Sequence, residues 1–379
     1  MTTSTITVAA PGRVNVIGEH TDYNRGFALP LALPHRVTVH ADRHPLPDRQ
    51  EVVASSVGHG TITVPLDTQP GDIDGWGSYL AGVMWALKQN GYDVPPAHLE
   101  LESNVPTGAG LSSSAALECA VLVAFAELAD WNIDPTEAAL IAQQAENQYV
   151  GAPTGSMDQM ASMHGRQGHM MFMDFADNSV RQVPADLAAA GMELLVIDTR
   201  APHRHVAGEY GARRRSCEIA QEILGVPSLR DISSNDLPHA LATLQASTPP
   251  DGQHPDTLAR RVKHVVSENE RVRRAVHNLE NGELENLGPI LTEGHASLRD
   301  DYEVTVAQLD VAAAAAEEAG ALGARMTGGG FGGSVIALVY QDQASVIEDA
   351  VKAAFAEAEY TTPEIFHATP SRGAGRIDI

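Results

Sequence analysis

One stretch reads Val105-Pro106-Thr107-Gly108-Ala109-Gly110-Leu111-Ser112-Ser113-Ser114-Ala115-Ala116 and sets two glycines and three serines directly before an apolar, helix-forming run. Glycine lets the backbone turn sharply and approach a ligand closely. The first amides of a helix lack partners within the helix and carry the positive end of its dipole. The stretch therefore predicts an anion site, for which phosphate is the natural occupant.

The same stretch differs from a Walker P-loop, because it lacks the Gly-x-x-x-x-Gly-Lys-Ser/Thr spacing. A nucleotide bound here would be held by backbone amides and hydroxyls, without a loop lysine. The alternative is a surface turn capped by a serine, and the stretch alone leaves both interpretations open.

Composition favours a globular protein of two domains. At 379 residues the chain exceeds one ordinary core, and 43% of its residues are hydrophobic. It carries 49 acidic and 25 basic side chains, a formal net charge of -24. This charge argues against a nucleic-acid partner and against docking on an anionic membrane. ATP is also an anion, so its site would need a local positive field from helix termini, Mg²⁺ and a few arginines.

Cysteine content and hydropathy indicate the compartment. Cys119 and Cys217 are too few for a disulfide framework or a cysteine-rich metal site, so a reducing compartment fits. The amino terminus lacks a basic stretch followed by a long apolar segment, and no apolar run approaches the length of a membrane span. We therefore expect a cytoplasmic protein.

Hydrophobic periodicity predicts mixed strands and helices in the first half of the chain and mostly helices after it. In the first half we expect strands over residues 5–9, 28–41, 98–103, 170–180 and 193–198, a hairpin over 51–64, and helices over 74–90, 115–129 and 135–150. Further helices are expected over 208–224, 258–281, 284–302 and 305–320. A domain boundary is expected between the last of the early helices and the strand at 193–198.

A second glycine cluster at residues 328–333 formally contains the Gly-x-Gly-x-x-Gly of dinucleotide sites. That fingerprint lies between a strand and a following helix, whereas here we expect an alanine-rich helix before the cluster and a strand over 334–339 after it. This context argues against a Rossmann dehydrogenase. A tight helix-to-strand turn is one interpretation, but five glycines in six positions indicate a close approach of the backbone to another group.

The segment 12–23 contains one guanidinium, two carboxylates and one imidazole within twelve positions. Carboxylates accept hydrogen bonds from pairs of sugar hydroxyls, and imidazole can donate or accept, so Glu19, His20 and Asp22 would suit a polyol. Metal binding is a competing interpretation, although the spacing matches no regular zinc or calcium site. A solvated polar loop is the third interpretation.

Two more carboxylates, Glu146 and Asp158, stand on either side of a Pro/Gly segment. Glu146 is expected on a helix, where it could hold Mg²⁺ together with a serine hydroxyl. Asp158 is expected on a loop, free to approach a substrate hydroxyl. The alternatives are an exposed helix face for Glu146 and a helix cap for Asp158.

Taken in order, these motifs resemble the GHMP kinases and, among them, the galactokinase family. Residues 12–23 are similar to the galactokinase signature, 108–115 to the nucleotide motif of the family, and 326–333 to its third motif. Further similar stretches are 151–159, Glu209-Tyr210 with 213–215, and 295–303. The resemblance covers nearly the whole chain.

The resemblance implies a two-domain α/β (α+β) GHMP kinase fold. Residues 1–174 would form a domain like domain 2 of ribosomal protein S5, and residues 175–379 a ferredoxin-like α/β domain, with the active site in the cleft between them. The implied reaction is the phosphorylation of the anomeric hydroxyl of α-D-galactose by ATP, the first committed step of galactose catabolism. The implied partners are galactose, ATP and Mg²⁺, and a monomer is expected.

The resemblance also implies a role for each motif. Arg13 would stabilise the transition state, and Asp158 would accept the proton of the sugar hydroxyl or orient that hydroxyl. Magnesium would be held by Ser114 and Glu146. The phosphates would be wrapped by Gly108, Ala109, Gly110, Leu111, Ser112, Ser113 and Ser114, and the sugar would be contacted by Glu19, His20, Thr21, Asp22, Gly155, Asp158 and Tyr210.

Three positions depart from the family pattern and leave fine specificity open. Thr154 stands where the family often has cysteine, Thr107 where leucine is common, and Arg25 where glycine is common. A kinase for N-acetylgalactosamine or another sugar is therefore an alternative, because discrimination at one ring carbon depends on pocket shape. A non-catalytic sensor of sugar and ATP is disfavoured, because the serine run is continuous and both Arg13 and Asp158 are present.

Overall fold

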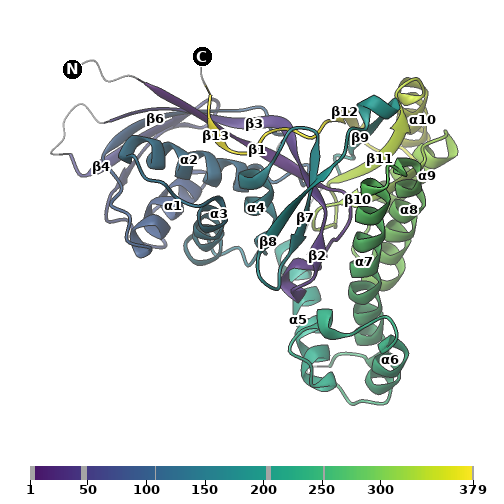
Figure 1. Ribbon diagram of the computed structural model, residues 1–379. Coiled ribbons are helices and arrows are strands. Elements are labelled where there is room, and N and C mark those ends of the chain that lie inside the picture. Colours follow the sequence, from purple (N-terminus) through teal and green to yellow (C-terminus); the bar gives the residue numbers. More distant parts are fainter. Residues whose placement is uncertain (1–4, 44–48, 107, 202–205, 251, 378–379) are drawn as a thin grey trace.

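Alternating apolar residues build the largest sheet of the protein. The computed structural model describes residues 5–43, 49–106, 108–201, 206–250 and 252–377 (Figure 1). Within these residues a six-stranded sheet has the order β13-β1-β3-β6-β4-β5. Its strands are β1 (Ile6–Asn15), β3 (Pro30–Arg43), β4 (Glu51–Ser56), β5 (Gly60–Pro65), β6 (Ala97–Ser103) and β13 (Gly375–Arg376). The strands predicted over 5–9, 28–41 and 98–103 and the hairpin predicted over 51–64 are therefore confirmed.

β13 brings the carboxyl-terminal segment back to this sheet, where Val8 pairs with Arg376 beside β1. The other neighbour of β1 is β3, and their register shifts between Pro11 and Arg13. Such an irregularity bends a strand and changes the direction of its side chains. Arg13, which follows this shift near the end of β1, lines the site described below.

Helices cover the six-stranded sheet on one side (Figure 1). They are α1 (Gly77–Gln89), α2 (Ser113–Ala129), α3 (Pro135–Gln144) and α4 (Met157–His164). α2 packs on β1 and β3, and most of its buried apolar residues, from Ala116 to Phe125, belong to the main hydrophobic core. Apolar residues on nearly all sides of α2 explain why this helix lies between the sheet and the other helices.

The helix predicted over 135–150 changes its form near its end. Asp134 caps α3 by accepting from the amide of Thr136 at 2.9 Å, but the α-helical part ends at Gln144. Residues Ala145–Val150 form one π-helical turn, which ends at Gly151 with a φ of 85°. A π-turn rotates the side chains that follow it relative to an α-helix, and here it carries Glu146.

The second half of the chain builds a four-stranded sheet of order β10-β11-β9-β12. Its strands are β9 (Met192–Asp198), β10 (Gly323–Thr327), β11 (Ser334–Tyr340) and β12 (Glu364–Ala368). The helices of this half are α5 (Val206–Leu224), α6 (Leu237–Gln245), α7 (Pro255–Glu280), α8 (Leu287–Ser297), α9 (Ala307–Glu318) and α10 (Ala344–Glu357). α7 to α10 stand side by side, with α5 and α6 near one end of α7 (Figure 1).

Several shorter elements complete the fold. A π-turn at Leu298–Tyr302 follows α8, and 3₁₀ turns occur at Asp22–Asn24, Ala188–Ala190, Leu229–Asp231 and Leu284–Asn286. The helix predicted over 284–302 is thus three consecutive helical segments of different type. No helix in the described part of the chain has both the length and the apolar character needed to span a bilayer.

A three-stranded sheet of order β2-β7-β8 lies at the junction of the two halves. Its strands are β2 (Phe27–Ala28), β7 (His169–Asp174) and β8 (Ser179–Pro184). The strand predicted over 170–180 is therefore the hairpin of β7 and β8. The expected boundary between residues 174 and 175 falls inside that hairpin, and this boundary stays a prediction.

The surroundings predicted for the second glycine cluster were wrong. β10 lies between α9 and the cluster, so residues 328–333 join two antiparallel strands, β10 and β11, instead of a helix and a strand. The short strand was missed because it follows the alanine-rich helix directly. A strand still follows the cluster, so the exclusion of a dinucleotide fingerprint is unaffected.

Candidate active site

Most of the predicted site residues line one cavity of about 560 Å³. It lies where the end of β1, the start of α2, α4, α5 and the β10–β11 loop meet. Its walls include Arg13, Glu19, His20, Asp22, Gly108, Gly110, Leu111, Ser112, Ser113, Ser114, Gly155, Asp158 and Tyr210. Residues more than 200 positions apart in the sequence thus share one hollow, as expected of a ligand site between two halves of a chain.

Asp158 and Arg13 form an ion pair in this cavity. Nε of Arg13 donates to Oδ1 of Asp158 at 2.9 Å, and Nη2 lies 2.8 Å from the same oxygen. The other carboxylate oxygen, Oδ2, accepts from the Ser112 hydroxyl at 2.5 Å. Arg13 is 4% exposed, whereas the Asp158 side chain is 27% exposed. The carboxylate is therefore held from two sides and still open to a ligand.

Asp158 lies on α4, so the prediction of a loop position was wrong. α4 begins at Met157, so Asp158 lies in the first turn of this helix. The alternative role as a helix cap is also excluded, because the carboxylate contacts Arg13 and Ser112. A position on a helix holds the side chain more firmly than a loop would.

The phosphate loop, residues 108–114, has the backbone of a tight turn. Gly108 and Gly110 have φ of 79° and 73°, and Ser112 has a φ of 59°. The loop carbonyls are occupied by protein groups: Ala109 accepts from the hydroxyl of Ser334 at 2.7 Å, and Gly110 accepts from Nη1 of Arg13 at 2.6 Å. Thr107, one of the three departures, lies outside the described residues.

The start of α2 completes the anion site. The helix begins at Ser113, and Ser112 precedes it without a capping hydrogen bond from its side chain. The interpretation as a serine-capped turn is therefore wrong, because the Ser112 hydroxyl donates its hydrogen bond to Asp158 instead. The first amides of α2 stand at the cavity with the three serine hydroxyls, a donor set suited to phosphate oxygens.

Glu146 lies behind this loop and is buried, which excludes an exposed helix face. Its Oε2 accepts from Oγ1 of Thr154 at 2.7 Å and from Nε2 of Gln159 at 2.8 Å. Burial raises the pKa of Glu146, with Asp158 adding to the effect, while the hydroxyls of Thr154 and Ser114 oppose it. The departure at Thr154 therefore supplies a hydrogen bond to a predicted metal ligand.

A cation fits between Ser114 and Glu146 on chemical grounds. Burial and the neighbouring Glu146 raise the pKa of Glu118 well above its usual range, and Oε1 of this fully buried carboxyl has no hydrogen-bond partner. Clustered acids of this kind are relieved by a positive charge. Among the described residues no group of three or more His, Cys, Asp or Glu forms a metal site. The remaining ligands would come from phosphate and water, as is usual for Mg²⁺.

The segment of residues 16–21, called the sugar loop below, contributes Glu19 and His20 to the wall of the cavity. Glu19 is 2% exposed, and one of its carboxylate oxygens accepts from the Gly328 amide at 2.8 Å. Burial raises the pKa of Glu19 to about 7, although Arg325 and Arg13 partly oppose this. Near pH 7 the carboxyl group of Glu19 is therefore present in both its protonated and its ionised form. It can donate a hydrogen bond to a ligand hydroxyl in the first form and accept one in the second.

Both ring nitrogens of His20 already have protein partners. Nδ1 lies 2.8 Å from the Tyr23 hydroxyl and Nε2 lies 3.2 Å from the Gly329 carbonyl oxygen. Burial lowers the pKa of His20 to about 3, so the ring is neutral, and Nε2 carries the hydrogen because a carbonyl only accepts. A sugar hydroxyl would have to share or replace one of these contacts.

Asp22 and Gly155 meet in the cavity at very short range. A Cβ atom on Gly155 would lie 1.6 Å from Oδ2 of Asp22, so only glycine fits there. Burial raises the pKa of Asp22 to about 6, and the nearby Asp158 carboxylate acts in the same direction. The ring of Tyr210 closes this side, with its centroid 5.3 Å from that of His20.

Three predicted residues do not line the cavity. The Thr21 hydroxyl is fully buried and lies within hydrogen-bond distance of two carbonyl oxygens, those of Gly18 at 2.8 Å and Phe27 at 2.6 Å. Ala109 is also buried, and Glu146 lies behind the lining. Thr21 and Ala109 therefore shape the loops instead of facing a ligand directly.

Sequence reasoning missed several lining residues. They are Val150, Gly151, Ala152, Pro153, Thr154, Met157, Gly328 and Gly329. The glycine cluster at 328–333 was the available signal for the last two, since its composition indicated a close backbone approach. Residues 151–157 lie within the stretch 151–159 that resembles the family, although only Gly155 among them was assigned a role, and no signal in the sequence marked Val150.

Comparison with known proteins agrees with this geometry. The chain is 47% identical over 372 residues to a galactokinase of Streptomyces coelicolor, covering 97% of this chain and 93% of that protein. It is 44% identical to a galactokinase of Mycobacterium tuberculosis, covering 98% and 99%. Among solved structures, galactokinase of Lactococcus lactis complexed with galactose matches with a TM-score of 0.90 and 30% identity, covering 99% of this chain and 95% of that one.

More distant structures share the fold alone. Mevalonate kinase of Methanococcus jannaschii matches with a TM-score of 0.66 at 14% identity, over 97% of this chain and 99% of that one. Family models match at residues 78–166 (GHMP kinases N terminal domain), 2–43 (galactokinase galactose-binding signature) and 275–357 (GHMP kinases C terminal). The α/β fold with amino- and carboxyl-terminal GHMP kinase regions is thereby confirmed, and the chain belongs to the galactokinase family of the GHMP kinases.

Proposed function

We propose that the chain transfers the γ-phosphate of ATP to the anomeric hydroxyl of α-D-galactose and releases galactose 1-phosphate and ADP. Its family makes it an ATP-dependent sugar kinase. The observation that carries the proposal is the Asp158 carboxylate, held between Arg13 and Ser112 where the phosphate loop meets the sugar loop. A hydroxyl placed at that carboxylate would face a phosphate held by the loop.

Charge neutralisation and alignment are the main tasks in phosphoryl transfer. Arg13 is a buried cation whose Nη1 binds the Gly110 carbonyl in the phosphate loop, so its charge is fixed beside the transferring group. Asp158 would accept a hydrogen bond from the attacking hydroxyl, and it would orient that hydroxyl even if the proton leaves late. Because the Asp158 carboxylate is held rigidly, the hydroxyl would be oriented before reaction, and such orientation can supply a large part of a rate enhancement.

Magnesium would be held by Ser114 and Glu146, where it would neutralise charge on the ATP phosphates. The contacts from Thr154 and Gln159 would keep the Glu146 carboxylate in place. For Glu146→Gln we expect the Mg²⁺ concentration for half-maximal rate to rise at least as much as the about 10- to 100-fold typical of losing an outer-shell partner. An unchanged Mg²⁺ titration would remove Glu146 from the metal site.

Sugar recognition would fall to Glu19, Asp22 and Tyr210, which line the same cavity as the phosphate loop. A buried site with several hydrogen-bonding groups rejects a sugar that leaves one of them unpaired. We further propose that the protein acts as a cytoplasmic monomer. Its two cysteines are free and buried, which suits a reducing compartment. Light scattering after size-exclusion chromatography tests the monomer.

A substrate panel tests the proposed function. Purified protein with ATP and Mg²⁺ is given galactose, glucose or N-acetylgalactosamine, and ADP and sugar 1-phosphate are both measured. We expect galactose to react fastest. Fastest turnover of N-acetylgalactosamine would assign the enzyme to that sugar, and no ADP release with any sugar would reject the reaction. Asp158→Asn, purified in parallel, controls for contaminating kinases.

A further inference from the structure

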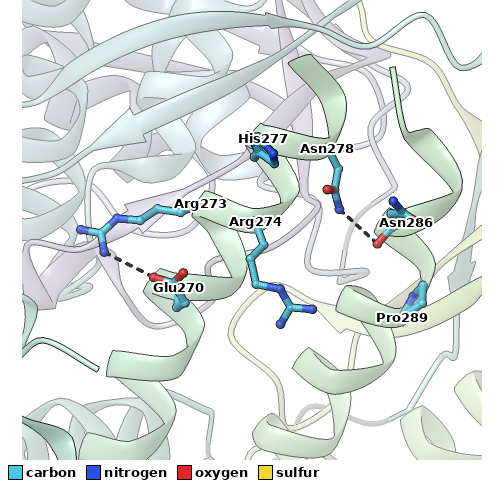
Figure 2. Close-up of a pocket in the computed structure, with 7 residues that line it drawn as sticks. All are labelled: Glu270, Arg273, Arg274, His277, Asn278, Asn286 and Pro289. Carbon is cyan, nitrogen blue, oxygen red and sulfur yellow. Dashed lines mark hydrogen bonds and ion pairs between the residues drawn. The ribbon is translucent and has the colours of Figure 1, made fainter. Parts of the chain in front are cut away.

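α7 carries two Glu–Arg pairs of the same i, i+3 spacing on opposite faces. Successive residues of a helix are about 100° apart, so pairs displaced by two positions face opposite ways. The outer pair is Glu270–Arg273, at 3.5 Å, with both side chains about half exposed. It borders a surface hollow of about 490 Å³ between α7 and α8 (Figure 2). The arginines there are paired with acids, since Arg274 binds Glu293 at 2.7 Å.

The inner pair, Glu268–Arg271, is buried. Nε of Arg271 donates to Oε2 of Glu268 at 2.7 Å, and the two side chains are 8% and 0% exposed. A second guanidinium comes from Arg325 on β10, which is fully buried and whose Nη2 lies 3.2 Å from Oε1 of Glu268. Although burial acts to raise the pKa of Glu268, Arg325 and Arg271 hold it well below its usual range. Glu268 is therefore a buried carboxylate anion.

This anion binds the backbone of the sugar loop. Oε1 of Glu268 accepts from the amide of Gly18 at 2.9 Å and from that of Glu19 at 3.3 Å. Arg325 donates from Nη1 to the carbonyl of Val16 at 3.0 Å. The Gly18 turn needs such support, because its φ is 105° and a Cβ there would lie 2.5 Å from the Phe27 carbonyl oxygen.

Both backbone polar groups of Glu19 are thus bound by α7. Its amide donates to Glu268, and its carbonyl oxygen lies 3.1 Å from Nε2 of His264 on the same helix. Burial lowers the pKa of His264 to about 4, so this ring is neutral and donates from Nε2. With the backbone fixed, the Glu19 carboxylate is directed to the Gly328 amide and the cavity.

A buried ion pair is weak support for stability, because hydrophobic residues of similar volume often stabilise a fold equally well. The charge of Glu268 also strengthens its hydrogen bonds to the amides of Gly18 and Glu19, since hydrogen bonds to an ionised acceptor are about twice as strong as neutral ones. We propose that Glu268 is a positioning residue for sugar binding: held by Arg271 and Arg325, it fixes the Gly18–Glu19 backbone so that Glu19 faces the sugar. This inference rests on the proposed sugar kinase function.

The test compares Glu268→Gln with Glu270→Gln, its match on the outer face of the same helix. Glu268→Gln keeps the volume but loses the charge that binds the two amides. We expect the galactose KM to rise about tenfold, which corresponds to one charge-assisted hydrogen bond, while the ATP KM stays within about twofold. Glu270→Gln should keep both KM values. A merely structural role would instead lower the fraction of active enzyme and leave both KM values unchanged.

A second variant, Arg271→Lys, serves as the control for a folding defect. It keeps the positive charge but loses the Nε donor. If Glu268→Gln does not fold, Arg271→Lys tests the positioning role in its place. We expect its galactose KM to rise and its ATP KM to stay unchanged. Hydrogen exchange should be faster at Gly18 and Glu19 in either variant and unchanged in residues 108–114. Unchanged exchange and a normal galactose KM in a folded variant would overturn the inference. Lack of galactose turnover by the unmodified enzyme would instead reject the proposed function.

Discussion

The phosphate loop and the sugar loop meet at the same cavity, but they differ in what fixes their shape. The phosphate loop owes its ligand-facing groups to its own residues: two glycines with positive φ, three serines and the start of α2. The sugar loop owes its shape to Glu268 and Arg325, 250 and 309 positions from the backbone groups that they bind. One loop is a local motif, whereas the other is held in place by the second half of the chain.

This difference separates two parts of the reaction. In the proposed function, phosphate binding depends on a local pattern of glycines and serines at the start of α2. Sugar binding, as we propose it, depends on long-range packing, so distant substitutions should alter it more readily than phosphate binding. Asp158 lies between the two loops, and substitutions there should affect both.

The largest effect is expected at that junction, from Asp158→Asn. The amide keeps the volume but removes the charge that Arg13 and Ser112 hold. We expect kcat to fall about 10²- to 10⁴-fold, the range for loss of a positioned proton acceptor, with smaller changes in both KM values. Steady-state rates and a thermal unfolding curve measure this. A folded variant with near-normal kcat would exclude Asp158 from the reaction.

The second effect is a pH dependence of the free energy of unfolding, and it arises from His264, which binds the backbone of the sugar loop. His264 has a pKa of about 4 in the folded protein against an ordinary value of 6.5, so the unfolded chain binds the proton more readily between these values. Its contribution to stability is therefore present above pH 6.5 and is lost as the pH falls toward 4, by about 3 kcal/mol. In His264→Gln this part of the pH dependence should disappear.

Urea unfolding of both proteins between pH 7 and pH 4 measures this difference. Glu19 and Asp22 titrate in both proteins, so their contributions cancel when the two curves are subtracted. His254→Gln, at an exposed position before the same helix, serves as the matched control. Parallel pH curves for the unmodified protein and His264→Gln would show that His264 is not buried in its neutral form.

The third effect isolates the sugar side of the cavity through Gly155→Ala. The added Cβ would lie 1.6 Å from the Asp22 carboxylate, so Asp22 must move. A displacement of about 1 Å at a reacting centre can cost about 100-fold in rate, and we expect kcat/KM for galactose to fall by that order while the ATP KM changes little. Gly375→Ala, where no atom lies within 4 Å of an added Cβ, is the control. Equal losses for galactose and ATP would contradict the assignment of Gly155 to the sugar side.

The same division between local and distant supports explains what the sequence could predict. The anion site of the phosphate loop follows from glycines and serines next to a helix, all within one short stretch. The resemblance of residues 12–23 to a known signature marked Arg13 and Glu19. The element type of most long periodic segments, such as α1, α2 and α7, was also predictable.

Other features depended on contacts that no local pattern encodes. Glu268 and Arg325 resemble ordinary charged residues of a helix and a strand, and only the fold shows that both are buried together. The π-turn at Glu146 has the composition of a continuing helix. β10 was not predicted, because it comes soon after the alanine-rich α9 in the sequence. α4 was not predicted either, because it follows a Pro/Gly segment, and Asp158 was therefore expected on a loop. In each case tertiary packing outweighs local propensity.

The smallest effect, from Ser334→Ala, sharpens the comparison most directly. The Ser334 hydroxyl is the long-range support of the phosphate loop at Ala109, buried and 2.7 Å from its carbonyl oxygen. Its loss should lower the free energy of unfolding by about 1 kcal/mol. If the loop is a local motif, the ATP KM should change by less than about threefold, against the larger change in galactose KM expected for Glu268→Gln. A large rise in the ATP KM would show that both loops depend on distant supports.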